Sequence, residues 1–452
     1  MNKPRSSKLL LAAGISAAAI AFTSSSAQAQ SADALIDKLV DKGVLTVDEA
    51  QALRDEADKD FTKAYSAKSG LPEWATAVKF NGDLRGRFDG IYRSTEPDAV
   101  SDRNRLRYRL RFGVTANLMD SIEVGFRLAS GDGEGAIAGN SNPISSNQSL
   151  DNNGIKKGIY IDLAYAKWSP INTREFQGGL TLGKMENPFV FSDIVFDSDY
   201  TPEGFAGAFS YQPTDAHVIK VTAGGFVLKE VSASSNDGAL GVAQLRWDAI
   251  WSKKITSSVG VAALAIVGKE SLTNGAVANV NFGNTRSTGT GPLVSNMNPY
   301  VGDVSVTYML ESFPFYAGPF PIKFAGDFMQ NPGAPSDRNT AYSVGLTFGK
   351  SGKKGLWEIG YRYRSLEADA WYEEMVDSDT GAYYGAGIPN SGAGAGYRAG
   401  TNNRGHIVKA SYSPYDSLTL GVSWYNIEAI NEIPASSNSK IDRIQVDAAF
   451  KF

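Results

Sequence analysis

Hydrophobic and polar residues alternate with a period of two from about residue 76 onwards. The pattern is sharpest over residues 105–116, where leucine, tyrosine, phenylalanine and valine occupy even positions. The odd positions begin with four arginines: Arg105, Arg107, Arg109 and Arg111. Because successive side chains of a β-strand point to opposite faces, this segment predicts a strand with one apolar and one strongly basic face.

The same alternation predicts about 16 strands, many of them close to the 9–11 residues that cross a bilayer obliquely. Its phase is ambiguous in two segments, 159–169 and 205–212. The predicted strands cover residues 76–93, 103–118, 122–130, 159–169, 176–185, 205–212, 217–230, 239–251, 256–268, 299–311, 320–330, 340–350, 355–366, 405–413, 418–428 and 441–452.

Long and short connections alternate between these strands. If the first strand runs outward, the outer connections span 94–102, 131–158, 186–204, 231–238, 269–298, 331–339, 367–404 and 429–440. The inner connections span only 119–121, 170–175, 213–216, 252–255, 312–319, 351–354 and 414–417. Outer-membrane barrels have long outer loops and short periplasmic turns, whereas a sandwich or a propeller has no reason to sort its loops in this way. The sequence therefore predicts an all-β fold, a transmembrane antiparallel β-barrel of about 16 strands.

The last predicted strand keeps one apolar face up to its end, which carries Ile444, Val446, Ala448, Phe450 and Phe452. A terminal aromatic residue after an alternating strand resembles the C-terminal signature of Gram-negative outer-membrane proteins. The resemblance implies that Phe450 and Phe452 form an assembly signal for the barrel-assembly machinery. It also implies that outer-membrane lipid surrounds the barrel.

The start of the chain has the pattern of an export signal. Basic residues precede an apolar run from Leu9 to Phe22, and Ala27-Gln28-Ala29 has the small residues of a cleavage site. We therefore expect residues 1–29 to be a cleaved signal peptide. The apolar run is short for a membrane-spanning helix.

Residues 30–70 have helical rather than strand periodicity. Apolar residues follow helical spacing around Leu35 and Leu39, and Thr46-Val47-Asp48-Glu49 has the spacing of a capping box. This predicts a short periplasmic helical segment, and residues 71–452 would then form the barrel. The segment either packs against other elements and supports oligomerisation or is a loosely ordered spacer; the sequence leaves both open.

Composition and charge exclude several classes of function. The chain has no cysteine and a formal net charge of −4, so thiolate chemistry is excluded and nucleic-acid binding is not expected. The mean hydropathy of −0.22 is compatible with a membrane barrel, which needs an apolar face only towards lipid. We expect the inside of the barrel to be polar.

No constellation of residues predicts catalysis or a cofactor. The chain has two histidines, and the topology places His217 at the periplasmic rim and His406 at the outer rim, so we expect no enzyme. Asp193, Asp197, Asp199 and Glu203 do not match a calcium-binding loop, and we expect no metal site. The glycine-rich run Gly381–Gly400 lacks the lysine and the helix of a phosphate loop, and we interpret it as part of a long surface loop.

Three features together resemble the family of Gram-negative proteins called "putative porin". They are the segment Leu39–Thr46, the terminal phenylalanine strand, and the segment Gly183-Lys184-Met185-Glu186-Asn187-Pro188-Phe189 followed by Asp197-Ser198-Asp199-Tyr200-Thr201-Pro202-Glu203-Gly204. The resemblance covers essentially the whole mature chain, and the middle segment is its most specific part. It implies a multi-stranded outer-membrane pore for small hydrophilic solutes. Porins of this kind are usually homotrimers.

A basic patch and an acidic loop are the candidate pore residues. The inward register of the first three strands carries Arg85, Arg87, Arg105, Arg107, Arg109, Arg111 and Arg127. Porins that this chain resembles fold their third long loop into the barrel, which here would bring in Asp193, Asp197 and Asp199, with Glu203 nearby. Arginine opposite acid would set a transverse field, and the excess of arginine predicts a mild preference for anions. The alternative function is a barrel without transport, acting as an adhesin or a receptor through its long loops.

We predict that residues 31–66 are dispensable for a conducting barrel. A variant that begins near Leu71 should refold into a β-rich species that conducts ions in planar bilayers. If circular dichroism shows no β-rich species, the helical segment is an integral part of the fold.

Overall fold

The computed structural model describes residues 74–93, 102–131, 144–232, 235–274, 276–277, 282–385, 395–431 and 439–452. The predicted signal peptide and helical segment, residues 1–70, lie outside the described residues. In the described part of the chain, no helix has the length and hydrophobicity needed to cross a membrane.

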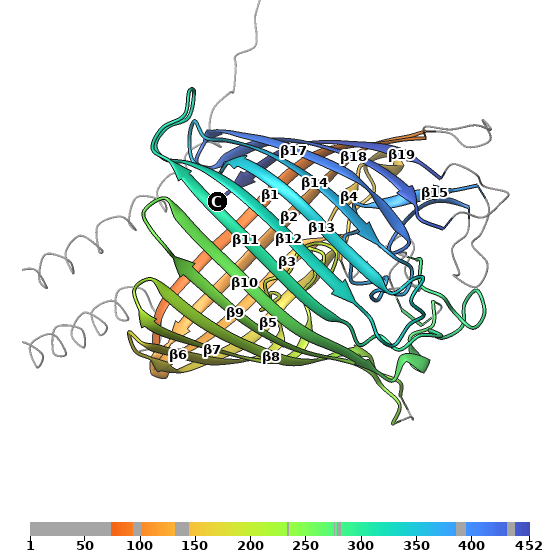
Figure 1. Ribbon diagram of the computed structural model, residues 1–452, viewed down its shortest axis with the longest axis horizontal. Helices are drawn as coiled ribbons and strands as arrows, with labels where there is room; N and C mark the ends of the chain where they lie inside the picture. Colours follow the sequence, from red (N-terminus) through yellow and green to blue (C-terminus); the bar gives the residue numbers. More distant parts are fainter. Residues whose placement is uncertain are drawn as a thin grey trace, which may run out of the picture. The chain divides into compact units, whose positions relative to one another are not determined.

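Sixteen strands pair in sequence order, and the last pairs with the first, which closes an antiparallel barrel. Figure 1 shows the strands wound obliquely around the barrel, with β1 beside β2. The barrel strands are β1 (Ala75–Arg93), β2 (Arg103–Leu118), β3 (Ile122–Ser130), β5 (Ile159–Asn172), β6 (Phe176–Lys184), β7 (Glu203–Thr214), β8 (His217–Lys229), β9 (Gly238–Ile250), β10 (Ile255–Val267), β11 (Tyr300–Leu310), β12 (Phe320–Gln330), β13 (Thr340–Gly349), β14 (Trp357–Leu366), β17 (Asn403–Tyr415), β18 (Leu418–Ala429) and β19 (Ile441–Lys451). The predicted fold class and strand number are confirmed.

The pairing explains why the phase of residues 159–169 was ambiguous. The register between β3 and β5 shifts by one residue at Asp162, since Leu128 pairs with Ile161 and Arg127 with Leu163. An extra residue in one strand reverses the faces of all residues after it. The exposed apolar side chains accordingly change from odd positions, such as Ile161, to even positions, such as Trp168.

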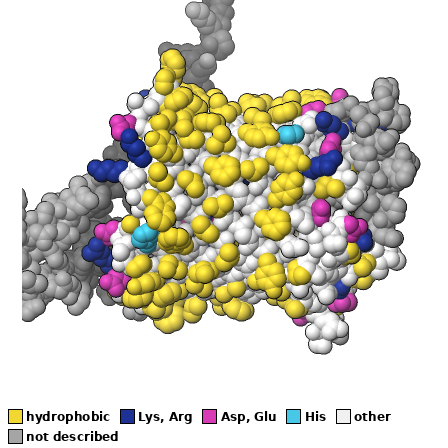
Figure 2. Space-filling view, in the orientation of Figure 1, with side chains coloured by type: hydrophobic (Ala, Val, Ile, Leu, Met, Phe, Trp, Pro, Cys, Tyr) yellow, Lys and Arg dark blue, Asp and Glu magenta, His cyan; other side chains and the backbone are white. Residues whose placement is uncertain are grey.

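The outer surface of the barrel is apolar. Along β2, the side chains of Leu106, Leu110 and Phe112 are 40–57% exposed, whereas the arginines between them are turned inwards. Figure 2 shows hydrophobic side chains over the middle of the surface, with charged side chains towards its two ends. An apolar outer belt of this kind replaces protein–water contacts by contacts with lipid.

The strand connections are sorted by length as predicted, and three long ones fold into the barrel. We name them L3 (residues 185–202), L5 (268–299) and L7 (367–402). They pack on the inner faces of β7–β14 through a buried apolar cluster. Its loop residues include Phe189, Ile194, Val195, Phe196, Leu272, Leu293, Met297, Trp371, Tyr372, Met375 and Val376, and its wall residues include Phe226, Leu240, Leu264, Val301, Met329 and Leu366.

This cluster corrects two expectations. The inside of the barrel is not polar throughout, because one side of it is an apolar core for the loops. The glycine-rich run Gly381–Gly400 is not simply part of a surface loop: its described ends form two short strands, β15 (Gly381–Tyr384) and β16 (Gly396–Ala399), in which Ala382 and Tyr384 are buried. Small residues allow this close packing, a role that a glycine-rich composition does not distinguish from loop flexibility.

We predict that deletion of Phe452 impairs barrel assembly. Phe452 and Gly82 exchange backbone hydrogen bonds of 2.9 and 3.1 Å at the seam between the first and last strands, so the deletion shortens this seam by one hydrogen-bonded pair. The variant should show less of the fast-migrating band that folded barrels give on unheated denaturing gels. Surviving barrels should conduct normally. A normal amount of folded barrel combined with altered conductance would contradict this role.

Candidate functional site

One side of the barrel interior is a wall of arginines on β1, β2 and β19. Arg87, Arg107 and Arg109 are each less than 10% exposed, and Arg443 on β19 is fully buried. Arg443 is not among the pore residues predicted from the sequence. It lies on the inner face of the strand that closes the barrel, and β19 pairs directly with β1.

Carboxylates on the same strands neutralise much of this wall. Asp83 accepts hydrogen bonds from Arg109 at 2.9 Å and from Arg111 at 2.6 Å. Asp89 is fully buried and forms ion pairs of 2.7 Å with both Arg105 and Arg443. The arginines therefore avoid mutual repulsion through wall acids rather than through loop acids alone.

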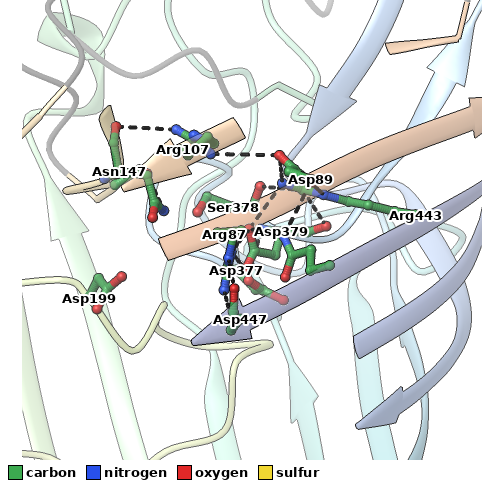
Figure 3. Close-up of polar contacts among 12 residues, drawn as sticks. Arg87, Asp89, Arg107, Asn147, Asp199, Asp377, Ser378, Asp379, Arg443 and Asp447 are labelled. Carbon is green, nitrogen blue, oxygen red and sulfur yellow. Dashed lines mark hydrogen bonds and ion pairs between the residues drawn. The ribbon is translucent and has the colours of Figure 1, made fainter. Parts of the chain in front are cut away.

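Arg87 is held between two acids. Its Nε lies 2.7 Å from Asp447 on β19, and its Nη1 lies 3.1 Å from Asp379 of L7. Asp379 also lies 3.2 Å from Arg443 (Figure 3). L7 therefore reaches the arginine wall at the junction between β1 and β19.

L3 crosses the whole interior from the β6–β7 side. Gln244 on β9 donates a hydrogen bond to the carbonyl of Val190, and Asp193 forms a 2.6 Å ion pair with Arg362 on β14. On its return, Asp199 forms a 2.9 Å ion pair with Arg109 on β2. Because β14 and β2 lie on different sides of the barrel, L3 bridges two walls and narrows the interior.

The predicted loop acids thus have three different surroundings. Asp199 faces the arginine wall, as expected, whereas Asp193 pairs with the far wall. Asp197 accepts a hydrogen bond from the backbone N–H of Ser378 in L7. Glu203 lies outside the loop: it is the first residue of β7 and pairs with Lys184 at 3.0 Å, with its side chain 64% exposed.

Arg127 is the third-strand arginine of the predicted patch. It lies away from the network around Arg87 and Asp379, and binds Asp162 at 2.5 Å and Glu186 of L3 at 2.8 Å. Asp162, the extra residue that shifts the register of β5, is therefore an ion-pair partner of Arg127. The patch predicted from register divides into two groups with separate acids.

Arg85 is held by a polar residue of the connection between β3 and β5. Its Nη2 donates to Asn147 Oδ1 at 2.7 Å, and its buried Nε has no hydrogen-bond partner among the described residues. Arg107 donates to the carbonyl oxygen of Asn147 at 3.3 Å (Figure 3). Asn147 carries no charge, so this part of the wall retains positive charge next to its polar partner.

L3 and L7 meet at a cluster of aspartates within the barrel. The backbone N–H of Asp377 donates to the carbonyl of Asp193, and that of Asp197 donates to the carbonyl of Met375. Burial, together with Asp193 and Asp379, raises the pKa of Asp377 to about 6. Burial, Asp377 and Asp199 also raise the pKa of Asp197 above its usual range.

Neither histidine joins a catalytic arrangement in the described structure. His217 packs beside Trp247 and Trp251, and His406 forms a 2.8 Å hydrogen bond with the hydroxyl of Tyr361. No group of three or more His, Cys, Asp or Glu side chains among the described residues is arranged to hold a metal ion.

Comparison with known proteins relates this barrel to porins. Residues 91–263 match the model of a family described as "Putative porin", which confirms the resemblance over this part of the chain. No curated protein matches the sequence.

Solved structures with a similar fold are also porin-like barrels. A high-pH structure of OprB from Pseudomonas putida has a TM-score of 0.50 and 10% identity, and the match covers 86% of this chain and 97% of that one. The outer-membrane channel DcaP of Acinetobacter baumannii has a TM-score of 0.42 and 12% identity, and the match covers 83% of this chain and 97% of that one. OmpF of Salmonella typhi, in complex with daunomycin, has a TM-score of 0.46 and 10% identity, and the match covers 83% of this chain and 97% of that one. At 10% identity the likeness to OprB shows the fold alone.

We predict that the contact between L3 and L7 tightens as pH falls from 7.5 to 5. The pKa of Asp377 is about 6 when the loops are docked, whereas an exposed aspartate in separated loops has a pKa of 3.8. The docked loops therefore bind a proton more tightly than the separated loops, so protonation favours docking. The stabilisation of the docked loops begins as pH falls through about 6 and is complete near pH 4. Burial alone would raise the pKa of Asp379, but Arg87 and Arg443 outweigh this effect and lower it. Asp379 therefore does not titrate between pH 7.5 and 5.

Amide hydrogen exchange tests this prediction. After correction for intrinsic rates, exchange in residues 193–199 and 371–379 should slow by about tenfold between pH 7.5 and pH 5, the effect of one pKa unit. Asp377→Asn should remove most of this dependence. Exchange that quickens on acidification would show that the aspartates oppose docking when protonated.

Proposed function

We propose that this chain is an outer-membrane porin, a channel for the passive diffusion of small hydrophilic solutes and ions. The main support is a closed barrel with an apolar outer face and a charged interior that two inward-folded loops narrow. A closed barrel satisfies all strand hydrogen bonds in lipid, so only the interior offers a polar route across the membrane. The family match over residues 91–263 agrees with this proposal.

The constriction in this proposal lies beside the arginine wall, where L3 and L7 bind the wall and reduce the width of the interior. The wall supplies Arg85, Arg87, Arg105, Arg107, Arg109, Arg111 and Arg443. Asp199 of L3 and Asp379 of L7 bind this wall directly, so positive and negative charges lie side by side at the edge of the narrowed interior. Charged rings of this kind select ions by sign.

A mild anion preference follows from the pairing. Most wall arginines have a carboxylate within ion-pair distance, whereas Arg85 has Asn147 as its partner and no carboxylate partner in the described structure. Its charge is therefore the least compensated on the wall. The preference should be mild because Asp83, Asp89 and Asp447 cancel most of the remaining positive charge.

The assembly and location in this proposal follow from the porin fold. The signal peptide directs export, Phe450 and Phe452 contribute to recognition by the barrel-assembly machinery, and the mature barrel resides in the outer membrane, where a homotrimer is its expected state. The alternative function, an adhesin or a receptor, would use loops that extend outwards. The inward packing of L3, L5 and L7 favours the channel.

We predict that Arg85→Glu shifts the reversal potential in a KCl gradient towards cation selectivity. The substitution replaces an uncompensated positive charge by a negative one, and the shift should be larger at low salt, where the Debye length is longer. Arg174→Glu is the matched control, because Arg174 lies on a periplasmic turn with its side chain 81% exposed. An equal shift in both variants, or none in Arg85→Glu, would remove Arg85 from the permeation path. Absence of conductance in the wild-type protein would favour the adhesin or receptor.

A further inference from the structure

A cavity of about 320 Å³ lies in the barrel interior away from the arginine wall, beside the ion pair of Asp193 and Arg362. Residues 190–193 of L3 form one side of it, and the inner faces of β9, β11, β12, β13, β14 and β17 form the other. We propose that this cavity binds zwitterionic solutes of about the length of a dipeptide. This inference rests on the proposed pore function and identifies a solute class for it.

The cavity carries equal numbers of acidic and basic side chains. They are Asp193, Asp303, Asp327 and Glu358, and Arg246, Lys323, Arg362 and Lys409. Four of these eight side chains form two ion pairs: Arg246 binds Asp303 at 2.8 Å, and Arg362 binds Asp193 at 2.6 Å. Each of these four charges already has its counter-charge.

The other four charges have no ion-pair partner in the part of the chain that the structure describes. Lys409 lies over the ring of Tyr425 at 5.6 Å, and Asp327 accepts a 3.0 Å hydrogen bond from Ser343. The second carboxylate oxygen of Asp327 is buried and has no hydrogen-bond partner among the described residues. Lys409 is also attracted by Asp193, Asp377 and Asp379, so Lys323, Asp327 and Glu358 are the three charges of the cavity that remain for a solute.

Strand register places the available charges at opposite ends of a small-residue floor. Lys323 and Asp327 lie four residues apart on the same face of β12, about 13 Å along the strand. Ala325 lies between them, and its pairing partner on β13 is Gly345. These two residues leave room above the strand, and the flexible lysine side chain shortens the gap between the two charges.

This arrangement favours a solute with both charges over one with a single charge. The carboxylate of a zwitterion would bind Lys323 while its ammonium group binds Asp327. A simple anion would meet Asp327 and Glu358, and a simple cation would meet Lys323 and Lys409, so each would be repelled as well as attracted. A dipeptide separates its charges far enough to reach both ends of the floor, whereas a single amino acid holds them close together.

Block of ion current in planar bilayers tests this inference on the full-length protein. Glycylglycine should reduce KCl conductance with a half-blocking concentration about tenfold lower than that of N-acetylglycine N-methylamide, a neutral molecule of similar length. Glycine should block more weakly than glycylglycine. Equal block by all three molecules would overturn the inference.

Two variants locate the site. Lys323→Met combined with Asp327→Asn keeps the net charge and should raise the half-blocking concentration of glycylglycine about tenfold. Ala325→Leu, which fills the floor without changing charge, should have the same effect and serves if the double variant fails to fold. The matched control is Lys220→Met with Asp248→Asn, which removes a 2.8 Å ion pair that does not line the cavity.

The outcomes separate this inference from the proposed function. A pore that conducts KCl but is not blocked preferentially by glycylglycine overturns the zwitterion site and leaves the porin intact. Preferential block that is unchanged in both cavity variants also overturns it. Absence of KCl conductance in the wild type overturns the porin and the site together.

Discussion

The structure depends on the requirement that every backbone N–H and C=O group in lipid find a partner within the protein. Sixteen strands meet this requirement by closing on themselves, with β19 paired along β1 from Asp83 to Arg93. Closure fixes which side chains face outwards, because alternate residues must then lie on opposite sides of one continuous wall. The apolar belt outside and the charges inside are two consequences of the same geometry.

The strands and their faces could be predicted from sequence because alternation is a local property. Residues 105–116 show it fully, and the structure places their arginines inwards. The same rule was ambiguous in β5 because Asp162 is an extra residue that reverses the faces, and a single inserted residue leaves no compositional trace. The sorting of loop lengths was also visible, since it depends only on counting residues between strands.

The partners of the charged residues could not be predicted in the same way. Asp193 and Asp199 are six residues apart, yet they bind different sides of the barrel, because L3 extends across the interior and returns. Asp379 lies beside a glycine-rich run that indicated an exposed loop. Its contact with Arg87 and Arg443 depends on how L7 packs through Trp371, which is a tertiary property. The apolar inner faces of β9 and β10 were a signal that could have indicated buried loops.

The network around Asp379 also bears on the order of folding. Arg87 and Asp89 belong to the first strand, whereas Arg443 and Asp447 belong to the last, and they pair across the line along which the sheet closes. Asp379 binds both strands, so its complete binding site exists only once the two ends of the sheet have met. L7 therefore completes its docking after closure, and its contacts then hold the two edge strands together from inside. The residues of L7 that narrow the interior thus also hold the first and last strands of the closed barrel together.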